Sequence, residues 1–146
     1  MIDVAAERAR VVAIAHEWIG TRYQHGARIK GVCCDCTFPA KVYEEARVTG
    51  PIAIAPYVSN AHLHRASGQY ALRVREIARQ VERGEPGDLA LFFLARDYSH
   101  SGIITAEGWP WIIHADMAAG AVLKVRADSG ELTRASRIAF FSPKRW

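Results

Sequence analysis

The chain has 146 residues, of which 50% are hydrophobic and 23% are charged. This length corresponds to one compact domain, so we expect a single domain over residues 1–146. The apolar content is enough to bury a core, which excludes wholesale disorder. Lys and Arg (19) outnumber Asp and Glu (15), giving a formal net charge of +4. This excess is compatible with an anionic partner but does not distinguish nucleic acid, a membrane surface and an acidic polymer.

The N-terminal sequence has no basic segment followed by an apolar one, so no ordinary secretory signal is visible. No uninterrupted apolar run approaches the roughly 18–20 residues that cross a bilayer, so we expect no membrane span. We therefore expect synthesis in the cytoplasm and, for any work outside it, delivery by a route other than a cleaved signal.

Helical spacing of apolar residues dominates the first half of the chain. Apolar side chains of the first segment fall on one face and charged ones on the other, and Gly20 ends the pattern. A polar loop rich in Gly and basic residues follows over 21–32, and an irregular connection is expected over 51–67. The predicted helices are 4–19, 40–48 and 69–83.

Short apolar runs bounded by turn residues dominate the second half. The sequence Gly84–Asp88 is the strongest turn signal in the chain. The runs that follow are 89–94, 102–105, 111–115, 121–125 and 137–141, and each is typical of a strand. Helices followed by strands, without alternation, predict an α+β domain with a mostly antiparallel sheet.

The cysteines are clustered at Cys33, Cys34 and Cys36. They lie too close together to close a loop with a disulfide, so they do not indicate a disulfide scaffold. Catalytic chemistry, metal binding and coincidence remain as interpretations. Cys36 directly precedes the predicted second helix, and Pro39 suits a first helical turn. Cys36 as the N-cap would feel the positive helix end, which favours thiolate, and nearby backbone N–H groups could receive an oxyanion.

Two histidines stand at strand positions of the second half. His100 lies just before the strand predicted over 102–105, and His114 near the end of the strand over 111–115. A nucleophilic cysteine needs a base and an orienting group, and these two imidazoles could fill both roles. A lone histidine on an apolar strand is more often a buried, hydrogen-bonded core residue, so spacing alone leaves both interpretations open.

Five short motifs then follow one another along the chain. They are Gly20-Thr21-Arg22-Tyr23, Asp35-Cys36-Thr37, Gly87-Asp88-Leu89-Ala90-Leu91-Phe92, His100-Ser101-Gly102-Ile103 and Ile113-His114-Ala115. In this order they resemble the NlpC/P60 cysteine peptidases, with short phage or prophage cell-wall peptidases as the most similar branch. The resemblance implies a papain-like fold, with N-terminal helices packed on a mostly antiparallel five- to six-stranded sheet, and no cofactor or metal.

The resemblance also implies an activity, which is hydrolysis of peptidoglycan stem peptides, typically at the D-γ-glutamyl–diamino acid bond. Cys36 would be the nucleophile, His100 the general base and acid, and His114 the orienting residue. The remaining site residues would be Tyr23, Asp35 and Thr37, as oxyanion or substrate contacts. Implied partners are a peptidoglycan peptide and phage-tail or secretion-system proteins, with delivery to the wall by phage tail, secretion machine or lysis.

The segment after Cys36 departs from the family pattern, because Thr37-Phe38-Pro39 replaces a small residue, Gly and an aliphatic residue. This departure bears on substrate detail more than on catalytic competence. An interbacterial amidase effector and a thiol acyltransferase would use the same three catalytic residues.

Two further alternatives involve other classes of protein. A zinc module would use the cysteine cluster with His62 and His64, although no second CxxC pair is present. A nucleic-acid module has only scattered basic residues in its favour, so we expect no nucleic-acid partner.

Overall fold

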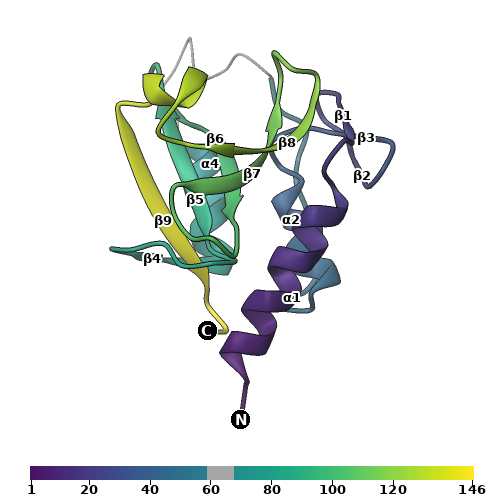
Figure 1. Cartoon of the computed structure of the whole chain (residues 1–146), viewed down its shortest axis with the longest axis vertical. Coiled ribbons are helices and arrows are strands. Elements are labelled where there is room, and N and C mark those ends of the chain that lie inside the picture. The colour runs from purple at the N-terminus through teal and green to yellow at the C-terminus, as the bar shows by residue number, and fades with distance from the viewer. Residues whose placement is uncertain (59–67) are drawn as a thin grey trace.

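The computed structural model describes residues 1–58 and 68–146 (Figure 1). Its helices are α1 (Val4–Glu17), α2 (Pro39–Glu45), α4 (Gln69–Ile77) and the 3-10 helix η1 (Gly130–Arg134). Three two-residue strands are β1 (Arg22–Tyr23), β2 (Arg28–Ile29) and β3 (Cys33–Cys34). The longer strands are β4 (Ala78–Val81), β5 (Leu89–Leu94), β6 (Asp97–Ile104), β7 (Trp111–Asp116), β8 (Ala121–Arg126) and β9 (Arg137–Pro143).

In the described ranges these strands form one sheet in the order β2-β3-β1-β8-β7-β6-β5-β9-β4. Neighbouring strands run antiparallel except β1 and β3, which are parallel. The predicted α+β class with a mostly antiparallel sheet is therefore confirmed. Strands β4 to β9 correspond to the expected five- to six-stranded sheet. Strands β1 and β2 extend it within the segment predicted as a loop, and β3 extends it within the cysteine cluster that follows.

The helix predicted over 69–83 is wrong in its second part. Helix α4 ends at Ile77, and Ala78–Val81 form β4, which pairs with β9. Arg79 lies opposite Ser142 and Val81 opposite Phe140. Pairing with a strand some 60 residues later cannot be read from local periodicity, and here it overrides the helical pattern.

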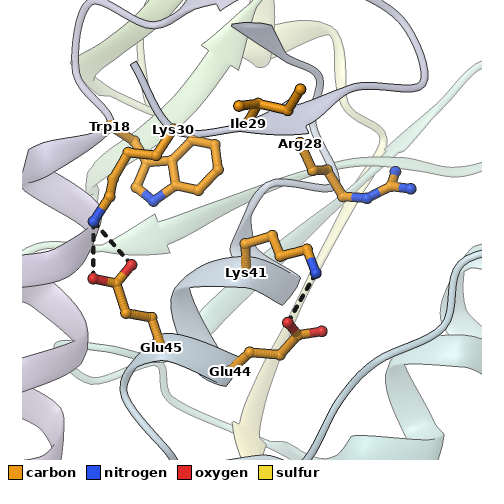
Figure 2. Close-up of a pocket in the computed structure, with 7 residues that line it drawn as sticks. All are labelled: Trp18, Arg28, Ile29, Lys30, Lys41, Glu44 and Glu45. Carbon is orange, nitrogen blue, oxygen red and sulfur yellow. Dashed lines mark hydrogen bonds and ion pairs between the residues drawn. The ribbon is translucent and has the colours of Figure 1, made fainter. Parts of the chain in front are cut away.

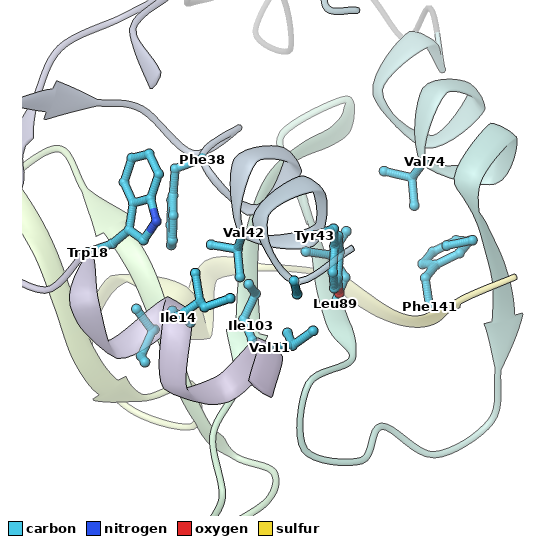
Figure 3. Close-up of a cluster of buried hydrophobic side chains, with 14 of the residues drawn as sticks. Val11, Ile14, Trp18, Phe38, Val42, Tyr43, Val74, Leu89, Ile103 and Phe141 are labelled. Atoms are coloured by element: carbon cyan, nitrogen blue, oxygen red, sulfur yellow. The ribbon is translucent and has the colours of Figure 1, made fainter. Parts of the chain in front are cut away.

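The main core lies between the helices and the sheet (Figure 3). Trp18, the C-cap of α1, packs against Phe38 with ring centroids 5.3 Å apart, and both side chains are buried. Val42 of α2 and Ile103 of β6 are fully buried in the same cluster. Each such side chain contributes about 1.5–3 kcal/mol on burial. This packing fixes the start of α2, and with it the cysteine segment, against β6.

A buried carboxylate ties the turn before β5 to both ends of the chain. Asp88, 1% exposed, accepts hydrogen bonds from Arg8 Nη1 at 2.8 Å and from Ser142 Oγ at 2.5 Å. Its second oxygen accepts the backbone N–H of Glu85 at 2.8 Å. Asp88 therefore shapes this turn, and its hydrogen bonds hold α1 and β9 at the base of the strand that leads to His100.

Candidate active site

Cys36 lies in a turn between β3 and α2 and is not the helix N-cap. The N-cap is Phe38, and Pro39 is the first residue of α2. The predicted position was wrong because the side chain of Asp35 accepts the Thr37 backbone N–H at 2.9 Å, and Phe38 N–H binds the Asp35 carbonyl at 3.1 Å. A turn closed by an Asp side chain competes with helix formation, so the helix starts later.

The residues on either side of His100 hold Cys36. Ser101 Oγ donates a hydrogen bond to the Cys36 carbonyl at 2.8 Å, and the Tyr70 hydroxyl donates to the same carbonyl at 3.2 Å. The Tyr70 hydroxyl oxygen also lies 2.7 Å from Ser101 Oγ, so its single hydrogen is shared between that oxygen and the carbonyl. The Cys36 thiol donates to the Ser99 carbonyl at 3.5 Å. The cysteine is thus attached to β6 through both its backbone and its sulfur.

The thiol of Cys36 is not activated in this state. Burial, with the negative charge of Asp35 as a second cause, raises the pKa of the Cys36 thiol to about 12, and a hydrogen bond from Tyr70 lowers it only in part. The expected preference for thiolate is therefore wrong for the free protein, because burial disfavours the charged form and Cys36 lies before the start of the helix. A base must take its proton as it attacks.

His100 and His114 are brought together as predicted. His100 Nε2 and His114 Nδ1 are 2.8 Å apart, within hydrogen-bonding distance, and the rings meet edge to face with centroids 5.0 Å apart. The ring of Phe92 packs 5.8 Å from that of His100. Burial lowers the pKa of His114, while the nearby Asp116 opposes this effect. His114 is therefore mainly neutral at pH 7.

Cys36 contacts the residue before His100 and, within the described ranges, is not bonded to the histidine pair. In the described part of the chain, its thiol forms no hydrogen bond with His100 or His114, and its acceptor is the carbonyl of Ser99. The structure thus brings the histidines together and places the cysteine beside the residue that precedes His100.

Asp35 organises the loop around the cysteine. Its carboxylate is 1% exposed; one oxygen accepts the Thr37 N–H and hydroxyl, at 2.9 and 2.6 Å. The other accepts the Gly26 N–H at 2.6 Å and the Tyr57 hydroxyl. His25 Nδ1 lies 3.9 Å away from the same oxygen. These donors use both carboxylate oxygens of Asp35. In this state the Asp35 side chain therefore holds neighbouring parts of the protein together.

Tyr23 lies in β1, paired with Cys34 of β3. Burial raises the pKa of Tyr23 to about 12, and the negative charge of Asp35 adds to the effect. Among residues 1–58 and 68–146 its hydroxyl has no hydrogen-bond partner. Tyr23 therefore holds a protonated hydroxyl near the cysteine, as an oxyanion contact requires.

Arg28 contacts Thr37, next to Cys36, and lines two surface hollows. Its Nη1 donates to Thr37 Oγ1 at 2.9 Å. One hollow, of about 500 Å³, is lined by Trp18, Arg28, Ile29, Lys30, Lys41, Glu44 and Glu45 (Figure 2). Its charges are largely paired, because Lys30 and Lys41 each lie 2.9 Å from a glutamate. The other, of about 270 Å³, is lined by His25, Gly26, Arg28, Ile54, Ala55, Pro56 and Tyr57.

Sequence reasoning missed Tyr70 and Ser101. Both contact the Cys36 carbonyl from distant parts of the chain. No local motif marks Tyr70, whereas Ser101 directly follows His100 in one of the five motifs, so a signal did exist for its position.

No three His, Cys, Asp or Glu side chains in the described ranges form a group that could hold a metal ion. His62 and His64, which the zinc alternative requires, lie outside those ranges. None of the helices described is both long and apolar enough to cross a membrane.

No protein-family model and no curated protein sequence matches the chain. Solved structures do match its fold. The NlpC/p60 domain of the peptidoglycan hydrolase SagA aligns at 20% identity, with a TM-score of 0.57, over 90% of this chain and 96% of that one. An N-acetylmuramoyl-L-alanine amidase from Bacteroides uniformis aligns at 10% identity, with a TM-score of 0.63, over 95% and 99%.

NlpC1 from Trichomonas vaginalis matches at 16% identity with a TM-score of 0.61. The alignment covers 97% of this chain but 45% of NlpC1, so the chain spans less than half the length of that protein. The chain therefore has the fold of NlpC/P60 domains, as the sequence motifs predict.

Proposed function

We propose that this protein is a cysteine hydrolase that cleaves peptidoglycan stem peptides. The observation that carries the proposal is the 2.8 Å contact between His100 and His114 on strands β6 and β7, with Cys36 held by the residues that flank His100. The fold shared with an NlpC/p60 domain of a peptidoglycan hydrolase supports the choice of substrate.

The proposed reaction begins when the Cys36 thiol exchanges the Ser99 carbonyl for His100. His100 uses Nε2 toward His114, so Nδ1 is the nitrogen that takes the thiol proton. The sulfur attacks the amide carbon, and the Tyr23 hydroxyl donates to the developing oxyanion. His100 then returns the proton to the leaving amine, and a thioester to Cys36 remains. Water, activated by the same imidazole, hydrolyses this thioester and restores the thiol.

The bond proposed is the D-γ-glutamyl–diamino acid bond, and a phage tail, a secretion machine or lysis would deliver the protein to the wall. The fold is also similar to that of an N-acetylmuramoyl-L-alanine amidase. The muramoyl–L-alanine bond is therefore the alternative cleavage site against which the D-γ-glutamyl bond is tested. An acyl transferase would instead pass the thioester acyl group to an amine or an alcohol.

Digestion of purified peptidoglycan followed by mass spectrometry of the released fragments tests both activity and bond. The wild type should release peptides that begin with the diamino acid and leave the D-glutamate on the glycan, and Cys36→Ala should release none while keeping its circular dichroism spectrum. Cys33→Ala is the matched control, because it alters a thiol of the same segment outside the proposed mechanism. Retained activity in Cys36→Ala, or no release by the wild type from walls of several chemotypes, would overturn the proposal.

A further inference from the structure

The contact between the two histidines restricts where protons can be. One hydrogen bond joins His100 Nε2 and His114 Nδ1, and it contains one proton. If that proton belongs to His114, then neutral His100 carries its own proton on Nδ1 and cannot accept another there. If it belongs to His100, Nδ1 of His100 is the basic nitrogen and His114 must carry its proton on Nε2. The second arrangement alone allows His100 to act as the base toward Cys36.

His114 Nε2 therefore decides whether the pair is productive. This atom is buried and has no hydrogen-bond partner in the described part of the chain, and the whole residue is 5% exposed. The carboxylate of Asp116 faces this atom, with Oδ2 3.8 Å from Nε2. That distance lies in the range of an ion pair and exceeds that of a direct hydrogen bond.

Asp116 is itself held in place at the end of β7. Its Oδ1 accepts the backbone N–H of Ala119 at 3.0 Å, and its carbonyl accepts that of Gly120 at 2.9 Å. The turn into β8 thus fixes one carboxylate oxygen and leaves the other near His114. A negative charge there attracts an N–H at Nε2 and repels a lone pair, so it favours one neutral tautomer.

We propose that Asp116 is a positioning residue that keeps the proton of His114 on Nε2, so that His100 presents a basic Nδ1 to Cys36. Asp116 touches neither the substrate nor the thiol and acts only through His114. The catalytic part of this inference rests on the proposed function, whereas the part that concerns the tautomer does not.

Asp116→Asn is the decisive variant. Asparagine keeps an oxygen for the Ala119 N–H but loses the charge, and its amide can donate to Nε2, which favours the opposite tautomer. Asp128→Asn is the matched control, because Asp128 is an exposed partner of Arg126 near the same sheet. The ¹⁵N chemical shifts of the ring nitrogens report the tautomer without substrate, and kcat and KM are measured on a soluble stem peptide.

In the wild type, ¹⁵N shifts should show His114 protonated at Nε2 and His100 unprotonated at Nδ1. Asp116→Asn should move the His114 proton to Nδ1 and lower kcat by about tenfold or more with little change in KM, the pattern of a base held in the wrong tautomer. Asp128→Asn should change neither readout. Unchanged ring shifts in Asp116→Asn would overturn the proposal, even if its activity fell. A wild type that is inactive on every wall but shows the tautomer response would overturn the proposed function alone.

Discussion

Ser101 Oγ donates a 2.8 Å hydrogen bond to the carbonyl of Cys36, and Ser101 directly follows His100 in β6. One strand thus carries the proposed base and, at the next residue, the group that fixes the backbone of the proposed nucleophile. A shift of that backbone moves the sulfur relative to the imidazole. Misplacement by about 1 Å can cost a hundredfold in rate.

Ser101→Ala should therefore reduce activity more than stability. The variant loses the hydrogen bonds of Ser101 to the Cys36 carbonyl and to Tyr70, each worth about 0.5–1.5 kcal/mol, and Tyr70 can still donate to the Cys36 carbonyl. We expect kcat to fall about tenfold, with the chain still folded, because the cysteine is less firmly placed. Steady-state kinetics and urea unfolding measure the two effects separately. A kcat equal to that of the wild type would show that Ser101 does not position Cys36.

The reactivity of Cys36 toward iodoacetamide should follow its raised pKa. Because the pKa of the thiol is about 12, alkylation should be slow at pH 7 and accelerate as the pH rises toward 10. Cys36 should still be labelled before Cys33 and Cys34, since both of these are buried. Tyr70→Phe removes a hydrogen bond that lowers the pKa, so its Cys36 should react more slowly than that of the wild type.

Peptide mapping by mass spectrometry over a range of pH gives these rates. Rapid labelling of Cys36 at pH 6 would show that the free protein already holds a thiolate.

Glu7 should make the stability of the fold depend on pH. A hydrogen bond from Arg145 is the main cause that lowers the pKa of Glu7, although burial opposes it, and Trp146 Nε1 donates to the same carboxylate at 2.8 Å. A carboxylate whose pKa is lower in the folded state stabilises the fold above its unfolded pKa. That stabilisation is lost as the pH falls through the folded pKa.

Glu7→Gln should thus lower the free energy of unfolding at pH 7 by about 1–2 kcal/mol. The difference from the wild type should shrink as the pH falls below 4.5, the ordinary value for this group. Urea unfolding at pH 7 and pH 3 tests both statements. Glu131→Gln, which alters an exposed pair with Arg134, is the control. An equal loss of stability at both pH values would exclude the carboxylate charge as the cause.

Gly102→Ala should disturb the position of His114. A β-carbon at Gly102 would lie 2.8 Å from Ile112 Cδ1, 3.1 Å from the Ile113 carbonyl oxygen and 3.3 Å from His114 Cβ. Relief of such crowding costs about 1–3 kcal/mol and requires β7 to shift. We expect a lower melting temperature together with a lower kcat. Gly50→Ala, whose β-carbon would meet nothing within 4 Å, should be neutral in both measurements.

Local patterns predicted most of the strands, because each long strand is marked by its own run of apolar residues between turns. The apolar runs at 89–94 and 121–125 coincide closely with β5 and β8. Strand β4 was missed entirely, since its partner β9 lies far along the chain. Strands β1 to β3 have two residues each, too few for any periodicity.

The candidate site could be predicted only in part, because local motifs name its residues but do not show how they contact one another. The motif order indicated Cys36, His100 and His114, and the structure joins the two histidines. The motif order could not show that the Asp35 side chain would delay the start of α2. Nor could it show that Tyr70 would approach Cys36 from 34 residues away. Such contacts depend on the packing of elements and not on their sequence order.

The ammonium of Lys30 connects both N-terminal helices with the hairpin of β2 and β3, since it lies 2.8 Å from Glu17 and 2.9 Å from Glu45. All three side chains are partly exposed, so dissolved ions screen this junction far more than they weaken the apolar core. The ionic strength of the medium therefore acts first on the hairpin that leads into the cysteine turn.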